Sequence, residues 1–274
     1  MRESFGVRVT AAVAARGPLC VGIDPHTTLL SQWGLPVDVS GLERFAMTCV
    51  EALAGEVAVV KPQSAFFEAH GSAGVAVLER LIASFRDTGT LVLLDVKRGD
   101  IGSTMAAYAQ AYLGEGSPLA ADAVTVSPYL GFGSLDPALE LAEKNGRGVF
   151  VLALTSNKEG PQVQRARDEN GVSVAQTIVD EAAARNAGAS PLGPVGLVIG
   201  ATVGQTELDL SKLNGMILAP GFGAQGAGVA DLRAVFGQNL QHVLPTSSRD
   251  ILRHGPNVTT LREAALRVRD SIAG

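Results

Sequence analysis

The sequence predicts an α/β protein in which parallel strands, each followed by a helix, close into a single (β/α)8 TIM barrel over residues 1–274. Short apolar runs alternate with helical patterns along the whole chain, and no linker, low-complexity tract or charge block divides it. The 274 residues also suit one barrel, which typically needs about 250. A doubly wound open sheet stays possible, because strand order cannot be read from a pattern.

Eight apolar runs are expected to be strands, since strands covered on both faces of a parallel sheet read as near-continuous hydrophobic segments. In chain order these runs are 19–23, 57–61, 91–96, 123–127, 148–154, 195–200, 216–219 and 242–245. Helices are expected where apolar residues recur at i, i+3, i+4 and i+7, as Leu42, Phe45 and Cys49 do. The expected helices are 41–54, 74–86, 101–113, 132–144, 172–187, 204–213, 228–236 and 259–272.

Composition and charge narrow the range of partners and locations. With 46% hydrophobic and 18% charged residues, the chain is expected to be globular. A net charge of −5 with scattered Lys and Arg argues against nucleic acid as a partner, whereas a phosphorylated small molecule needs only one or two local cations. Residues 1–15 lack the apolar core of a signal peptide, and no apolar run is long enough to span a membrane, so a cytoplasmic location without a membrane partner is expected.

Charged side chains gather just after the predicted strands, on the face where barrel active sites are built. Asp24, Lys61 and Arg249 each lie at or after a strand end, and Asp95 and Lys97 close the third strand. Taken singly, an Asp there can cap the next helix and a Lys can reach solvent. Together at one barrel mouth, these charges predict an alternating network of cations and anions, because their burial is otherwise costly.

The stretch 93–101 carries the densest of these charges. Residues two apart in a strand point to the same side, so Asp95 and Lys97 are expected to lie side by side. Asp100 follows Gly99 too closely to belong to the strand, and a helix N-cap is one interpretation of it. A surface turn with solvated charges is the alternative for the whole stretch.

The segment 219–228 contains a G-x-G-x-x-G pattern at Gly221, Gly223 and Gly226. The dinucleotide fingerprint belongs in the first βα turn of a nucleotide-binding fold, whereas this pattern follows the seventh predicted strand. In barrels, the loops after strands seven and eight commonly bind phosphate through backbone N–H groups, and Arg249 can add charged donors. We therefore expect a phosphate site, with a merely flexible glycine loop as the alternative.

Two further features bear on the chemistry. The polar loop 157–171 fits either a lid over the site or a tolerated surface insertion. The four histidines share no spacing with carboxylates, so neither a metal site nor a Ser-His-Asp arrangement is expected.

These landmarks together resemble the orotidine 5′-phosphate decarboxylase family. The core motif is matched by Asp95-x-Lys97-x-x-Asp100-Ile101, with Asp24 after strand one and Lys61 after strand two. The match continues in family order through Thr104, Ser156, Pro220-Gly221-x-Gly223-Ala224-Gln225 and Arg249, so it covers nearly the whole chain. The sequence of residues 97–104 is similar to that of the subgroup of the family with longer loops.

The resemblance implies a decarboxylation of orotidine 5′-phosphate to uridine 5′-phosphate and CO2 in de novo pyrimidine biosynthesis, without cofactor or metal. In that reaction Lys97 would protonate C6 of the pyrimidine, Asp95 would lie beside the substrate carboxylate, and Lys61 would link Asp95 to the ribose hydroxyls. The other implied contacts are those of Asp24 with ribose, Ser156 with the pyrimidine ring, and Gln225 and Arg249 with phosphate. A homodimer with shared sites is also implied, in which each partner receives Asp100, Ile101 and Thr104.

Three other functions stay open. A relative with the same Asp-x-Lys-x-x-Asp motif could be a sugar-phosphate decarboxylase or aldolase-type enzyme whose carboxylates bind Mg²⁺. The glycine pattern, taken literally, indicates a nicotinamide dehydrogenase. A regulatory barrel could bind a phosphate ligand without catalysis. Arg98 has no role in these hypotheses and is expected to be solvated or at the dimer interface.

Overall fold

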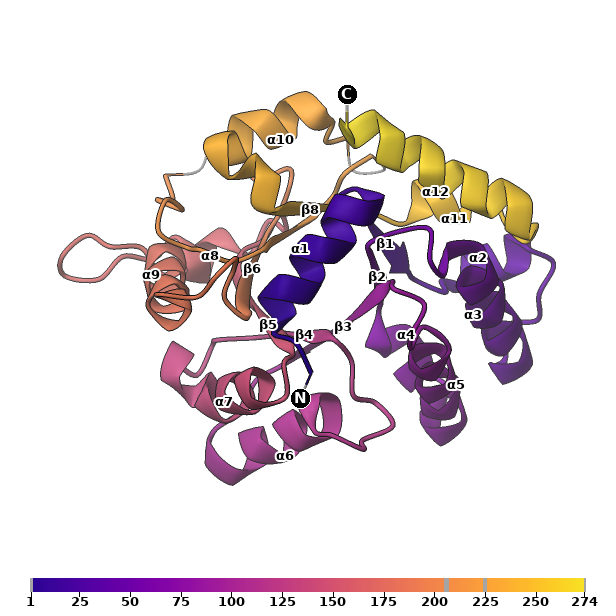
Figure 1. Cartoon of the computed structure of the whole chain (residues 1–274), viewed down its shortest axis with the longest axis horizontal. Coiled ribbons are helices and arrows are strands. Elements are labelled where there is room, and N and C mark those ends of the chain that lie inside the picture. The colour runs from indigo at the N-terminus through magenta and orange to yellow at the C-terminus, as the bar shows by residue number, and fades with distance from the viewer. Residues whose placement is uncertain (1, 205–206, 224–225, 274) are drawn as a thin grey trace.

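Strand pairing closes the sheet on itself. β1 (Cys20–Ile23) pairs in parallel with β2 (Val59–Pro62) on one side and with β8 (Val243–Ser247) on the other. The structure is a computed structural model that describes residues 2–204, 207–223 and 226–273, and within those ranges eight strands form a closed barrel (Figure 1). Closure excludes the open sheet and confirms the predicted (β/α)8 fold.

The remaining strands follow in sequence order around the barrel. They are β3 (Leu91–Arg98), β4 (Ala123–Val126), β5 (Gly148–Leu154), β6 (Val195–Ile199) and β7 (Ile217–Pro220). The helices are α1 (Phe5–Arg16), α2 (Thr27–Gln32), α3 (Val39–Leu53), α4 (Ser64–Glu68), α5 (Gly71–Ser84), α6 (Gly102–Leu113), α7 (Asp136–Lys144), α8 (Pro161–Gln164), α9 (Val174–Asn186), α10 (Val229–Phe236), α11 (Arg249–Leu252) and α12 (Val258–Ala273). Two 3-10 helices, η1 (Phe132–Leu135) and η2 (Gly237–His242), complete the described elements.

The helix α1 closes one end of the barrel, an element that the pattern of residues 1–15 does not predict. It lies across the strands in Figure 1 and buries Phe5, Val9 and Ala12 against side chains of the barrel interior. The Phe5 ring meets the Phe150 ring of β5 edge-on, with centroids 5.9 Å apart. A Cβ on Gly148 would lie 2.6 Å from the Phe5 ring, so only glycine fits there. The plugged end leaves the opposite end for the active site.

The prediction of a helix over 204–213 is wrong for the residues that the structure describes there. Residues 207–210 form no helix, and Ser211 and Lys212 lie in a turn. The Asp209 carboxylate accepts the Ser211 N–H at 2.9 Å, and the Asp209 N–H donates to Gln176 of α9 at 2.9 Å. Such side-chain partners compete with helical bonds. Leu210 and Leu213 are buried all the same, which explains the helix-like apolar spacing.

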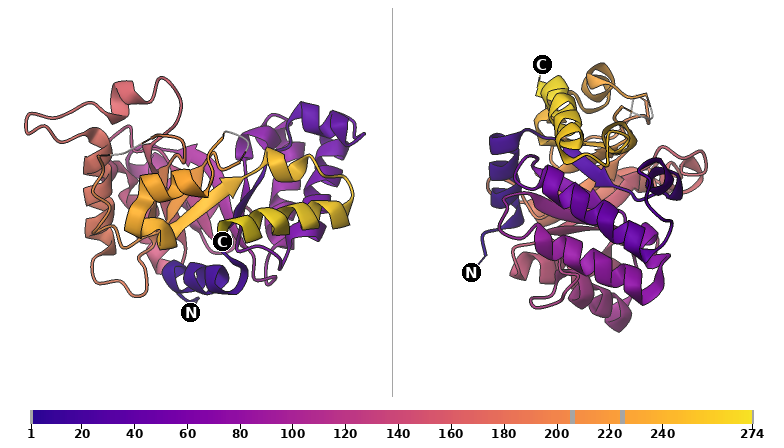
Figure 2. Two further views of the ribbon diagram at one scale, coloured as in Figure 1. Left: turned by 90° about the horizontal axis from the view of Figure 1, so that it is seen from above. Right: turned by 90° about the vertical axis from the view of Figure 1, so that its right-hand side faces the viewer.

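The long loop after β5 is ordered by local contacts. It contains the short helix α8, whose Gln164 accepts the Thr155 N–H at 2.9 Å, and a hairpin closed by the Arg167–Ser173 bridge. The hairpin projects beyond α9 in Figure 1. In the left view of Figure 2, this loop and the N-terminus lie at opposite ends of the molecule. Among the helices described, none is both long and apolar enough to cross a membrane.

Candidate active site

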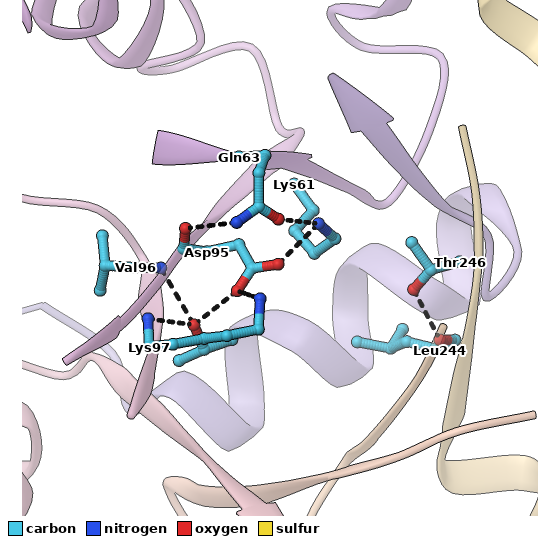
Figure 3. Close-up of polar contacts among 8 residues, drawn as sticks. Lys61, Gln63, Asp95, Val96, Lys97, Leu244 and Thr246 are labelled. Carbon is cyan, nitrogen blue, oxygen red and sulfur yellow. Dashed lines mark hydrogen bonds and ion pairs between the residues drawn. The ribbon is translucent and has the colours of Figure 1, made fainter. Parts of the chain in front are cut away.

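The Asp95 carboxylate lies between the ammonium groups of Lys61 and Lys97 (Figure 3). Asp95 Oδ2 is 2.9 Å from Lys61 Nζ, and Asp95 Oδ1 is 2.6 Å from Lys97 Nζ. Lys61 and Asp95 are buried, whereas the Lys97 side chain is 45% exposed. Three of the five charges of the predicted network therefore alternate in direct ion pairs, with Lys61 buried and Lys97 open to solvent.

The backbone at the end of β3 is irregular, and this irregularity directs Lys97. The register with β4 shifts between Leu94 and Arg98, and Lys97 has a φ of +47°, in the left-handed region that non-glycine residues rarely adopt. The Thr125 hydroxyl of β4 accepts the N–H groups of Val96 and Lys97, each at 3.0 Å, and donates to Asp95 Oδ1 at 2.7 Å. Strain of this kind is found where surrounding contacts hold it, often at active sites.

Charge complementarity decides the protonation of the buried pair. Burial by itself disfavours the charged forms, but Lys61 and Lys97 outweigh it and hold the pKa of the Asp95 carboxyl well below its usual range. Burial of Lys61 is likewise outweighed by Asp95 and Asp24, and its pKa is raised above the ordinary lysine value. At neutral pH the site therefore contains a carboxylate and a buried ammonium group.

A cavity of about 300 Å³ opens beside Lys61, toward the loops after β1, β7 and β8. Its walls include Asp24, Lys61, Pro220, Gly221 and Arg249, all predicted site residues, together with His26, Phe222, Thr246 and Ser248. One oxygen of Asp24, Oδ1, is buried and has no hydrogen-bond partner among the described residues. A buried acceptor of this kind suits a hydroxyl donor on a ligand.

The predicted phosphate loop borders the same cavity. Gly221 has a φ of +107° and Gly223 a φ of +79°, conformations that favour glycine and turn the chain back after β7. The Gly223 N–H donates to the Ala227 carbonyl at 2.8 Å, which holds the loop. Arg249 begins α11 and is exposed. Gln225, the other predicted phosphate ligand, lies outside the described residues.

Among the described residues, the remaining predicted site residues form no hydrogen bond or ion pair with Lys61 or Lys97. Ser156 is exposed on the loop after β5, beside Gly200. Asp100 is half-buried, and its Oδ1 accepts the Ile101 N–H at 2.8 Å. Ile101 is 62% exposed, and Thr104 is exposed on α6. The N-cap interpretation of Asp100 is wrong, because Ile101 occupies the N-cap position of α6 and no side-chain cap bond forms there.

Arg98, expected to be solvated or at the dimer interface, is partly exposed and has a partner within its own chain, while the interface position stays a prediction. Its guanidinium lies 2.7 Å from Glu68 of α4 and 5.8 Å from the centre of the Tyr108 ring.

Two site residues, Gln63 and Thr125, were not predicted from the sequence. Gln63 accepts a hydrogen bond from Lys61 and donates one to the Asp95 carbonyl, each at 3.4 Å. The Thr125 hydroxyl links Asp95 to the backbone N–H groups of Val96 and Lys97. A polar residue inside the apolar run 123–126 is the signal that could have indicated Thr125.

The geometry suits chemistry at one carbon of an anionic, phosphorylated substrate. An exposed ammonium can deliver a proton, a carboxylate beside it can act on developing charge, and a cavity with a glycine loop and an arginine can bind phosphate. Within the described ranges, no group of three or more His, Cys, Asp or Glu side chains could hold a metal ion. The fold and site thus define a (β/α)8-barrel enzyme built around a Lys-Asp-Lys network.

Comparisons with known proteins identify the family. The family model described as "Orotidine 5'-phosphate decarboxylase / HUMPS family" matches residues 17–264. The chain belongs to this family. It is 66% identical to an orotidine 5′-phosphate decarboxylase of Salinispora tropica over 97% of this chain and 96% of the relative. Identity to that of Streptomyces coelicolor is 59%, over 97% of this chain and 95% of the relative.

Solved structures agree with this assignment. A Streptomyces avermitilis structure assigned to the same enzyme is 59% identical, covers 99% of this chain and 95% of its own, and has a TM-score of 0.97. The Leishmania donovani OMP decarboxylase is 27% identical over 99% of this chain and 100% of its own, with a TM-score of 0.74. The predicted family resemblance is confirmed.

Proposed function

We propose that this chain converts orotidine 5′-phosphate to uridine 5′-phosphate and CO2, with Lys97 as the proton donor to C6. The activity follows from the family match and from curated orotidine 5′-phosphate decarboxylases up to 66% identical over nearly the full length, so the chain is a carboxy-lyase of pyrimidine biosynthesis. The observation that carries the residue roles is the Lys61–Asp95–Lys97 network.

The proposed chemical step needs a proton at a carbon that becomes negatively charged. When the C6–carboxylate bond breaks, its electron pair stays on C6 and CO2 leaves. The Lys97 ammonium group, which is 2.6 Å from Asp95 and partly open to solvent, would donate a proton to C6. Asp95, ionised between two lysines, would lie beside the departing carboxylate and keep Lys97 directed at the substrate.

The proposed substrate orientation places the nucleotide across the cavity beside Lys61. Asp24, with its unpartnered Oδ1, and Lys61 would take the ribose hydroxyls, while Gly221, Gly223, Arg249 and Gln225 would take the phosphate. Ser156 would face the pyrimidine. Phosphate binding far from C6 can then lower the barrier to decarboxylation, because remote binding energy can be used at the reacting carbon.

We also propose a homodimer in which Asp100, Ile101 and Thr104 complete the partner's site. Among the described residues, none of these three side chains forms a hydrogen bond or ion pair with Lys61 or Lys97. Ile101 is 62% exposed, and the next strand end adds Tyr129 at 77% and Leu130 at 52% exposure. Large apolar side chains exposed together often mark an interface. The cytoplasmic location expected from the sequence stays a prediction.

One assay tests the reaction and its metal independence together. Purified protein is incubated with orotidine 5′-phosphate in EDTA, and loss of the pyrimidine absorbance is followed. We expect full turnover in EDTA and no NAD(P) binding by thermal shift. Turnover that EDTA abolishes and Mg²⁺ restores would instead indicate the metal-dependent relatives, and absence of turnover in both conditions would favour a ligand-binding barrel.

A further inference from the structure

A second cavity, of about 700 Å³, lies at the barrel end that carries α1. It is bounded by α1, the end of α5, the first residues of β3 and the loop that precedes β4. The N-terminus, which contributes Arg2 to this cavity, lies in Figure 2 at the end away from the loop after β5. Among described residues, its lining shares no member with the cavity beside Lys61. Pockets for small molecules commonly measure about 300–1,000 Å³, so the space suits a ligand of nucleotide size.

The walls of this cavity carry a surplus of positive charge. Its charged lining residues are Arg2, Arg8, Arg86 and Arg147, against Asp87 and Asp122. Asp122 forms ion pairs with Arg2 and with Arg8, the second at 2.5 Å, and its other oxygen accepts the Val92 N–H at 2.8 Å. Among the described residues, neither Arg86 nor Arg147 has an ion-pair partner. Two guanidinium charges thus face the cavity without a matching carboxylate.

Among the arginines of this cavity, Arg147 is the most deeply buried. It is only 8% exposed, donates Nη1 to the Ala121 carbonyl, and has a buried Nε with no acceptor among the described residues. Arg8 Nε is also buried without an acceptor. Burial, with repulsion from Arg2, lowers the pKa of Arg147 to about 10 although Asp122 opposes this. A charged group buried without a counter-ion is costly, so an anionic ligand would relieve the cost.

We propose that this arginine cavity is a binding site for a phosphate-bearing metabolite of nucleotide size, separate from the active site. Guanidinium groups bind phosphate through paired N–H donors, and several of them around one cavity favour a di- or polyphosphate over a single carboxylate. Pro118 is exposed in the same lining and offers an apolar surface for the rest of the ligand. The ligand would supply the negative charge that Asp87 and Asp122 do not provide against four arginines.

The experiment uses an Arg249→Ala background, so that phosphate binding at the active site is weakened. Inorganic pyrophosphate and, separately, adenosine 5′-diphosphate are titrated by calorimetry. Arg2→Gln and Arg86→Gln are then added together, since both side chains are exposed and their loss should leave the fold intact. Arg185→Gln, on α9 and outside the cavity, is the matched control. Thermal unfolding of each variant, in pyrophosphate and in sodium chloride of equal ionic strength, checks folding and nonspecific screening.

We expect saturable binding at one site per chain in the background protein, and binding at least about ten-fold weaker with Arg2→Gln and Arg86→Gln, a loss of about 1.4 kcal/mol. The Arg185→Gln control should bind as the background does. Undiminished binding in the arginine variant, or no saturable binding in the background protein, would overturn the proposal. Tighter binding of adenosine 5′-diphosphate than of pyrophosphate supports a nucleotide-sized ligand, whereas equal or weaker binding overturns that part.

Discussion

The Thr125 hydroxyl donates to Asp95 Oδ1 at 2.7 Å, on the same oxygen that Lys97 contacts at 2.6 Å. The same hydroxyl accepts the N–H groups of Val96 and Lys97. One side chain of β4 thus fixes both the carboxylate and the strained backbone of its neighbour β3. It is a positioning residue, because nothing in its geometry requires it to touch the substrate.

We expect Thr125→Val to lower kcat about ten-fold with a smaller change in KM, because Asp95 and two backbone N–H groups lose their partner. Leaving buried groups unsatisfied costs about 1–3 kcal/mol, which should appear in the free energy of unfolding. Thr125→Ser keeps the hydroxyl and should restore most of the activity. Equal kcat values in the valine and serine variants would contradict the positioning role.

Lys97→Ala should reduce kcat by a factor of about 10²–10⁴ or more, the usual contribution of a positioned proton donor. Lys212→Ala, which removes a lysine in an exposed turn, is the matched control and should leave kcat unchanged. Steady-state assays with orotidine 5′-phosphate measure both. A Lys97→Ala protein that retains more than half of the wild-type kcat would rule out the proposed donor.

Arg249→Ala should lower kcat/KM for orotidine 5′-phosphate about 100-fold, because a charged hydrogen bond to phosphate contributes about 1.5–3 kcal/mol. Unphosphorylated orotidine should be turned over equally slowly by wild type and variant. Arg253→Ala, one turn further along and 3.9 Å from Asp250, provides the control. If Arg249→Ala lowered kcat/KM by the same factor for orotidine 5′-phosphate and for orotidine, Arg249 would act on a part of the substrate other than the phosphate.

The depressed pKa of Asp95 predicts how stability depends on pH. In the unfolded chain the Asp95 carboxyl has a pKa of about 4. As the pH falls, the unfolded chain therefore binds this proton at a higher pH than the folded chain does. The stabilisation is therefore complete above that value and is lost as the pH falls toward the folded pKa. Asp95→Asn should cost about 3–5 kcal/mol near neutral pH, since it leaves Lys61 buried without its carboxylate partner.

The same variant should show a shallower loss of unfolding free energy between about pH 5 and pH 2 than wild type. Urea denaturation at several pH values measures the slope. Asp180→Asn, exposed on α9, should follow the wild-type curve. Parallel curves for Asp95→Asn and wild type would show that Asp95 is not the group responsible.

Mixing an Asp100→Ala chain with a Lys97→Ala chain tests the shared site. Each parent should be nearly inactive, whereas heterodimers should contain one site with both defects and one intact site, and should regain up to half of the wild-type activity per site. Unfolding and refolding the mixture together promotes exchange. Persistent inactivity of the mixed dimers, verified by mass, would argue against a site built from two chains.

Much of this protein can be predicted from the order of its residues. Apolar runs alternating with helical patterns predict the barrel, because strands covered by helices must be hydrophobic on both faces. The Asp95-x-Lys97 spacing predicts a contact between the two side chains, which lie 2.6 Å apart. The positions of Asp24, Lys61 and Arg249 after strands predict that they meet at one end, since parallel strands all end on the same side.

Other features depend on tertiary structure because they join segments far apart in the chain. The α1 plug depends on Phe5 reaching Phe150, and Arg98 pairs with Glu68 of a different βα unit. The Thr125 bridge depends on a register shift between β3 and β4. The arginine cavity gathers Arg2, Arg86 and Arg147 from three segments. Periodicity along the chain reports which face is buried, whereas partners across the fold follow from strand register and helix packing, which no local pattern encodes.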